Sequence, residues 1–210
     1  GNLNLRPEKA DSWNIGGVLS PSFLPGFNAS VDYFRINLKE GINTFTAQNI
    51  IDLCFLGNDQ FCAAYSVDPA RSVPGQPYLL FRTQPFNAAS QLVRGIDFDA
   101  SYRLPLRGED GFTLRGVATR YIENLFNSGV PGTVPIDSVG ALGGGNGLTA
   151  QSVTPKWLYR FSASYDTQAF TATAVARGVS GGKYVADGIE CQTGCPPSTP
   201  QAPTYDENRV

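Results

Sequence analysis

Residues 156–166, KWLYRFSASYD, alternate between apolar and polar side chains, and this pattern constrains the fold more than any other feature of the chain. The odd positions carry aromatic rings or alanine, whereas the even positions carry mostly serine and charged residues. Successive side chains of a β-strand point to opposite faces of its sheet, so a period of two predicts a strand with one apolar and one polar face. Residues 96–104, IDFDASYRL, predict a second strand of this kind.

Four further segments alternate less strictly and bring the predicted strands to six. The alternation of residues 30–40 changes phase near Tyr33 and Phe34, which predicts a β-bulge there. Only residues 46–55 have the apolar spacing of a helix, with a threonine cap, and they lie within a predicted loop. The four weaker strand segments are 12–20, 30–40, 112–121 and 170–178.

The connections between these strands alternate in length. Tight turns are predicted at 23–27, 107–111 and 166–168, whereas the intervening connections run to roughly 50, 30 and 25 residues, lengths that are rare inside compact soluble domains. Short turns at one end of a sheet and long loops at the other are typical of a transmembrane β-barrel, with periplasmic turns and extracellular loops. We therefore predict an all-β fold, antiparallel and up-and-down, that forms an arc of a large transmembrane β-barrel.

The length of the clearest strand agrees with a membrane span. Residues 157 to 165 extend about 26 Å at ~3.3 Å per residue, or about 20 Å across a membrane at a tilt of ~40°, close to the ~25 Å apolar band of such barrels. Trp13 and Trp157 are predicted for the outer aromatic girdle, and Tyr102 and Tyr165 for the periplasmic one. The alternative is a soluble β-sandwich whose apolar face is its core, but such cores favour Val, Ile and Leu over Trp, Tyr, Phe, Ala and Gly.

Composition excludes several classes of function. The chain has no histidine, which removes Ser-His-Asp and Cys-His catalysis and most zinc and iron sites. The net charge of −2 gives no basic stripe for a nucleic-acid partner. We therefore predict neither an enzyme nor a cofactor, and no binding of nucleic acid.

The four cysteines fall into two close pairs, Cys54 with Cys62 and Cys191 with Cys195. Two local disulfides that brace extracellular loops are the favoured interpretation, and they imply an oxidising compartment. A single zinc site made of all four cysteines is the alternative, although seven and three intervening residues do not match the usual zinc-ligand spacing.

Polar residues of the predicted strands are candidates for the lining of the lumen. Asp97 and Asp99 share a face, and an acid–base pair is the functional alternative to a lumen lining beside Arg103. Arg160 is a further lumen candidate, and Arg115 and Asp166 are treated in the same way.

Aromatic residues in the first long loop are weaker candidates for ligand contacts. Phe61, Tyr65 and Tyr78 have rings that can stack on a sugar or an aromatic chelate. Packing of the loop's own small core around Cys54 and Cys62 is the alternative, and we favour it.

Several motifs, in the same order along the chain, resemble one family. Residues 1–16, GNLNLRPEKADSWNIG, resemble the Asn-x-x-Leu-Lys-Pro-Glu-x-x-x-x-Tyr-x-x-Gly signature of TonB-dependent outer-membrane receptors, with Arg6 in place of the lysine and Trp13 in place of the tyrosine. Residues 23–42 are similar to the family's Leu-Pro-Gly turn and the strand after it. Residues 94–104 are similar to its Gly-Ile/Val-Asp-x-x-x-x-Tyr strand.

This resemblance implies location in the bacterial cell outer membrane and a barrel of about 22 strands with a plug in its lumen. It also implies partners: outer-membrane lipid, the rest of the barrel and its plug, and an inner-membrane energy-coupling protein. Because single-chain barrels start at about eight strands, we expect residues 1–210 to be a partial β-barrel domain of about six strands, without the plug domain and the remaining strands.

The function implied is that of a segment of a receptor that imports a scarce, bulky nutrient by energy-coupled active transport. A ferric chelate such as a siderophore complex, a cobalamin or an oligosaccharide fits this description. The alternative is a secreted, disulfide-braced β-sandwich that binds carbohydrate.

Overall fold

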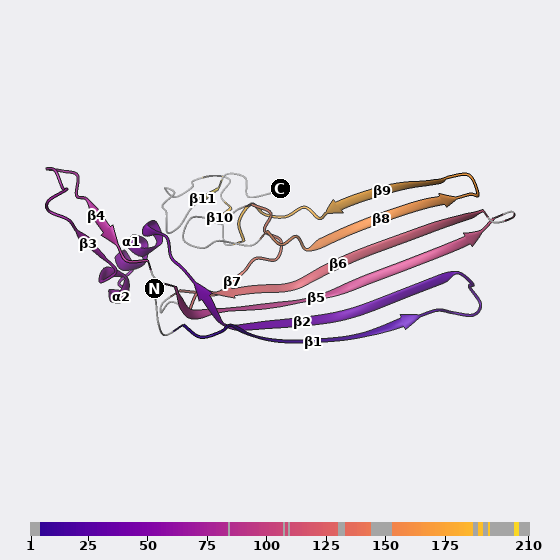
Figure 1. Ribbon diagram of the computed structural model, residues 1–210, viewed down its shortest axis with the longest axis horizontal. Helices are drawn as coiled ribbons and strands as arrows, with labels where there is room; N and C mark the ends of the chain where they lie inside the picture. The colour runs from indigo at the N-terminus through magenta and orange to yellow at the C-terminus, as the bar shows by residue number, and fades with distance from the viewer. Residues whose placement is uncertain are drawn as a thin grey trace.

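A computed structural model describes residues 5–83, 85–106, 108, 110–129, 133–143, 153–186, 189–190, 193 and 204–205. Half of the described chain belongs to one antiparallel sheet, whose six long strands lie side by side in chain order (Figure 1). The prediction of six antiparallel, up-and-down strands is confirmed. The order across the sheet is β1 (Lys9–Leu19), β2 (Phe27–Asn43), β5 (Phe86–Pro105), β6 (Gly111–Asn127), β8 (Trp157–Asp166) and β9 (Thr171–Val179), and the short β7 (Ile136–Asp137) pairs with β6.

The two ends of the sheet differ in how the strands are connected (Figure 1). At one end, here called the hairpin end, short turns join β1 to β2, β5 to β6 and β8 to β9. The amide of Leu106 donates to the carbonyl of Asp110 at 2.9 Å, and the amide of Thr167 donates to that of Phe170 at 2.9 Å. The long connections from β2 to β5 and from β6 to β8 lie at the opposite, loop end.

The predicted bulge near Tyr33 and Phe34 was wrong. β2 pairs without interruption with β1 and β5 through both residues, and its register against β5 shifts only further along, between Leu38 and Gly41 and between Gly41 and Ile42. Phe34 keeps its place on the polar face, where its ring lies 6.3 Å from that of Tyr121. The ring fits there because its cross-strand partner is Gly95, on which an added Cβ would lie 2.6 Å from Phe34 Cζ.

Glycines opposite aromatic rings recur on the other face. Gly116 is paired with Phe161, and Gly178 is paired with Tyr159, whose ring would lie about 2.5 Å from a Cβ at that glycine. A ring that covers a cross-strand glycine fills the space of the missing side chain, and it thereby fixes the register of the two strands.

The connection from β2 to β5 folds into a small unit of its own at the loop end. Helix α1 (Ala47–Phe55) begins at Thr46, whose hydroxyl accepts from the amide of Asn49 at 3.2 Å, as the threonine cap predicted. Cys54 and Cys62 form a disulfide, which confirms the first predicted pair. The helix α2 (Asp59–Cys62) and the hairpin of β3 (Tyr65–Val67) and β4 (Leu79–Phe81) complete the unit, hereafter the loop unit.

A buried polar cluster fixes the next long connection to the sheet. Asn124 of β6 donates to Thr154 at 2.7 Å, and the amide of Ser138 donates to the carbonyl of Asn124 at 3.0 Å. These three residues are buried, and the backbone of Ala141 bridges to Thr154 and to Lys183.

The pair Cys191 and Cys195 lies outside the described residues, and the nearest described segments are β10 (Ile189–Glu190) and β11 (Thr204–Tyr205), which pair in parallel. Within the described part of the chain, no helix has the length and apolar character needed to cross a membrane.

The close approach of Phe34 to Gly95 predicts a selective loss of stability on substitution. A Cβ at Gly95 would meet Phe34 Cζ at 2.6 Å and the carbonyl oxygen of Arg120 at 2.7 Å, so we expect Gly95→Ala to lower the free energy of unfolding by about 1–3 kcal/mol. Gly17→Ala is the matched control, because nothing lies within 4 Å of a Cβ there. Urea unfolding in lipid vesicles, followed by tryptophan fluorescence, measures both; equal effects would contradict this account of the register.

Candidate functional site

The register places mostly apolar side chains on one face of the sheet and most of the hydroxyl and acidic side chains of its middle on the other, with a row of charged residues (Arg35, Arg94 and Glu123) on the apolar face near the loop end. One apolar row runs from Gly17 through Val31, Phe98, Ala118 and Tyr159 to Gly178, each residue paired with the next. The adjacent row on the opposite face runs through Gly16, Asp32, Asp97, Thr119, Leu158 and Val179. The alternation predicted for single strands therefore extends across β2, β5 and β6 in these rows, whereas β8 and β9 contribute Leu158 and Val179 to the polar face.

The apolar face is exposed in this chain. Trp13 is 50% exposed, Phe161 55% and Ile15 68%, and the buried hydrophobic residues of the described chain lie mainly in the loops. No second sheet covers this face among the described residues, in contrast to a β-sandwich. A large apolar face of this kind requires an apolar surrounding medium, which the hydrocarbon core of a membrane supplies.

Aromatic pairs mark both ends of the apolar face. At the loop end, the rings of Trp13 and Tyr33 lie 5.3 Å apart, and the guanidinium of Arg120 lies 5.7 Å from the centre of the Trp157 ring. Tyr102 and Tyr165 lie at the hairpin end. Their ring partners are Phe27 at 6.5 Å and Phe170 at 6.1 Å, respectively. Trp157 and Tyr165 lie eight residues apart along β8, or about 26 Å at ~3.3 Å per residue, and the assignment of the four residues to two membrane girdles stays a prediction.

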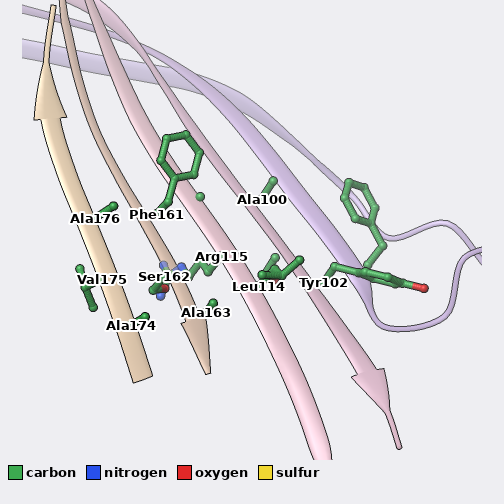
Figure 2. A pocket seen from close by; sticks show the side chains of 13 residues that line it. Ala100, Tyr102, Leu114, Arg115, Phe161, Ser162, Ala163, Ala174, Val175 and Ala176 are labelled. Carbon is green, nitrogen blue, oxygen red and sulfur yellow. The ribbon is translucent and has the colours of Figure 1, made fainter. Parts of the chain in front are cut away.

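A shallow hollow of about 590 Å³ interrupts the apolar face between Phe161 and Tyr102 (Figure 2). Small side chains form its floor, among them Ala100, Ala163 and Ala176. Ser101, Arg115 and Ser162 also belong to its lining, but most of the lining residues are apolar, as expected of a lipid-facing surface.

Hydrogen bonds and one ion pair connect β5 and β6 across the polar face. The hydroxyl of Thr119 donates to Asp97 at 2.6 Å, and Nε of Arg115 donates to Asp99 at 3.2 Å. Both carboxylates are therefore engaged by the neighbouring strand, and the arrangement gives no support to an acid–base pair. Arg103 lies nearer the hairpin end, where its guanidinium approaches Gly111.

Arg160 lies on the same polar face, directly opposite Arg177 of β9. Sequence reasoning passed over Arg177, although the alternation of residues 170–178 places it with the polar positions. Its signal was weak because its neighbour on that face, Val175, is apolar.

The predicted loop aromatics have different environments. Phe61 is 6% exposed, lies 5.1 Å from Phe45 ring to ring, and belongs to the core of the loop unit. Tyr65 is half-buried against Phe81, and its hydroxyl lies 3.8 Å from Sγ of Cys54. Tyr78 is 45% exposed, with the guanidinium of Arg71 over its ring. The contacts of Phe61 and Tyr65 are those of packing, and Tyr78 presents a ring to solvent.

Metal ligation has no obvious place in this arrangement. Among the residues that the structure describes, no three His, Cys, Asp or Glu side chains gather closely enough to hold an ion.

An open antiparallel sheet with a lipid-type face, a polar face and loops at one end defines the wall of an outer-membrane β-barrel. The chain belongs to the TonB-dependent receptor family: the model described as "TonB dependent receptor-like, beta-barrel" matches residues 1–205. Members of this family are transporters of the bacterial outer membrane that serve nutrient uptake, not enzymes. Searches among curated proteins and among solved structures found no match.

The assignment of faces predicts opposite outcomes at two adjacent residues of β8. Ala163 lies on the apolar face and Ser164 on the polar face. We expect Ala163→Arg to lower the free energy of unfolding in lipid vesicles by about 1–3 kcal/mol, between the values for the bilayer midplane and the interface. Ser164→Arg, its matched control, should change it by less than about 0.5 kcal/mol because the side chain enters water. The reverse order of the two effects in urea unfolding would refute the assignment.

Proposed function

We propose that this chain is part of the barrel wall of a receptor that imports a scarce, bulky nutrient by energy-coupled active transport. The observation that supports this proposal most is the sheet itself: a mostly apolar face lies directly opposite a face that carries charged and hydroxyl side chains. A wall of this kind separates lipid from a polar lumen. Large barrels of this class enclose a lumen wide enough for a plug.

The polar face supports passage of a hydrated or polar solute. Thr119 and Ser162 present hydroxyl groups there, and Asp99, Arg115 and Arg160 present charges of both signs. Side chains of this kind replace the hydrogen bonds that a polar solute loses when it leaves water. Substitutions on such a face tune selectivity more than they change stability.

The loop unit supports ligand capture outside the cell. It has its own core of Phe45, Ile50, Leu53 and Phe61, and the Cys54–Cys62 disulfide joins its two helices. A loop that is already ordered loses less conformational entropy when it binds a ligand. We assign to this unit the first contact with a ferric chelate, a cobalamin or an oligosaccharide.

The remaining partners follow from this transport cycle. Energy must reach the outer membrane from the inner membrane, so we propose a plug in the lumen and an inner-membrane energy-coupling protein that displaces it. Outer-membrane lipid surrounds the apolar face.

Uptake by cells that express the intact receptor tests this function. We expect a radiolabelled member of a panel of ferric chelates, cobalamin and oligosaccharides to enter starved cells, and a protonophore to abolish its uptake. Removal of residues 47–81, the helices and the hairpin of the loop unit, should reduce uptake of that solute at least tenfold. Receptor abundance in the outer membrane serves as the control. Undiminished uptake with the protonophore present, or no receptor-dependent uptake of any panel member, would contradict the proposal.

A further inference from the structure

Three arginines surround one pocket on the polar face. The pocket has a volume of about 520 Å³, and it shares Arg115 and Ser162 with the lining of the hollow of Figure 2. Arg115 comes from β6, Arg160 from β8 and Arg177 from β9. The pocket's other lining residues include Thr119 and Ser162.

The register explains why the three arginines line one pocket. Arg177 is paired directly with Arg160, and Arg115 is paired with Ser162, two residues further along β8. Cross-strand partners have Cβ atoms about 4.5–5.5 Å apart, and like charges in that position destabilise a sheet. The side chains of Arg160 and Arg177 therefore repel each other, and this repulsion lowers the stability of the isolated sheet.

Only one of the three arginines is neutralised by the described part of the chain. Asp99 forms an ion pair with Arg115, whereas neither Arg160 nor Arg177 has an acidic partner among the described residues. The neighbouring carboxylate of Asp97 accepts from Thr119 and lies on β5, two strands from β8, or about 10 Å away. Three guanidinium groups and one carboxylate leave two positive charges around the pocket.

The position of the pocket along the strands suits a binding step that follows capture of the substrate by the loops. Arg160 lies three residues along β8 from Trp157, the aromatic residue of the loop end, or about 10 Å at ~3.3 Å per residue. Arg103, the other predicted lumen arginine, lies near the hairpin end, where its guanidinium approaches Gly111. Arg160 and Arg177 therefore lie on the lumen-facing side of the wall, in the half that is nearer the extracellular loops.

We propose that Arg160 and Arg177 form an anion-binding subsite of the lumen, which takes the carboxylate or phosphate groups of a negatively charged substrate. The proposal rests on the transport function above and restricts its substrate to anionic solutes. A guanidinium presents donors in a planar fork that matches a carboxylate or a phosphate, so two opposed forks can hold a polyanion. Arg115, held by Asp99, adds a third donor group at the wall of the pocket.

Direct binding to the purified intact receptor tests the subsite without knowledge of the natural substrate. The probe is citrate, a tricarboxylate, and its neutral trimethyl ester is the chemical control; both are titrated calorimetrically in detergent at 150 mM salt. We expect saturable binding of citrate but not of the ester. Arg160→Gln combined with Arg177→Gln should weaken citrate binding at least tenfold, and the corresponding double lysine variant should restore part of it. Arg103→Gln is the matched control and should leave the affinity within twofold.

Three results of the titration would contradict the proposal of an anion-binding subsite. These are equal binding of citrate and its ester, citrate affinity unchanged in the double glutamine variant, or an equal loss in Arg103→Gln. A lower melting temperature of the double glutamine variant with unchanged citrate affinity would assign the two arginines to an acidic partner within the receptor instead.

The uptake assay separates this inference from the proposed function. Energy-dependent uptake of neutral solutes alone would leave the transport function intact and remove the anionic restriction. Binding of citrate that depends on Arg160 and Arg177, in a receptor without energy-dependent uptake, would retain the subsite and remove the transport function.

Discussion

Cross-strand backbone pairing is the interaction on which the rest of this structure depends. Backbone amides and carbonyls have no water to bind inside a bilayer, so each must find a partner on a neighbouring strand. Here β1, β2, β5, β6, β8 and β9 pair in chain order. The same pairing aligns side chains into rows, and a slip of one residue in any strand would exchange its lipid-facing and lumen-facing side chains.

The devices that hold this register are distributed over both faces. Phe34 covers Gly95 on the polar face, and Phe161 and Tyr159 cover Gly116 and Gly178 on the apolar face. The ion pair of Asp99 and Arg115 joins β5 to β6 in the polar layer. Both faces thus specify the register by shape and by charge, because an ion pair of Arg94 and Glu123 joins β5 to β6 on the face of Trp13 near the loop end. Loops at one end are then free to vary, because the sheet does not need them for its pairing.

The parts of this fold that the sequence predicts are those whose signal is local. Alternation in residues 156–166 identifies both faces of β8, and Thr46 marks the start of α1, because in each case the informative residues are close together in the chain. The sequence around Phe34 wrongly predicts a bulge because the glycine that accommodates its ring, Gly95, lies on another strand. The hairpin of β3 and β4 and the buried cluster around Asn124 were missed for the same reason, since their partners meet only in the fold.

The candidate site shows the same limit. Asp97, Asp99 and Arg160 are placed correctly on the polar face by alternation alone, whereas the pairing of Asp99 with Arg115 depends on the register between strands. Arg177 becomes informative only once β9 is known to lie beside β8. Conversely, Phe61 has an aromatic ring of the kind that contacts ligands, but it is buried in the core of the loop unit. Only the packed structure of the loop distinguishes the packing role from the ligand-binding role.

The central claim is that odd residues of β8 face lipid and even residues face water. A scan of nitroxide labels through positions 157–166 of the intact receptor in lipid vesicles tests it most directly, with one labelled cysteine at a time in a background without other cysteines. Collision rates with oxygen, which partitions into lipid, and with a water-soluble nickel chelate are measured at each position. The account predicts that the two rates alternate with a period of two and in opposite phase, with oxygen contact highest at 159, 161 and 163. Uniform access to the nickel chelate on both faces, or the opposite phase, would contradict it.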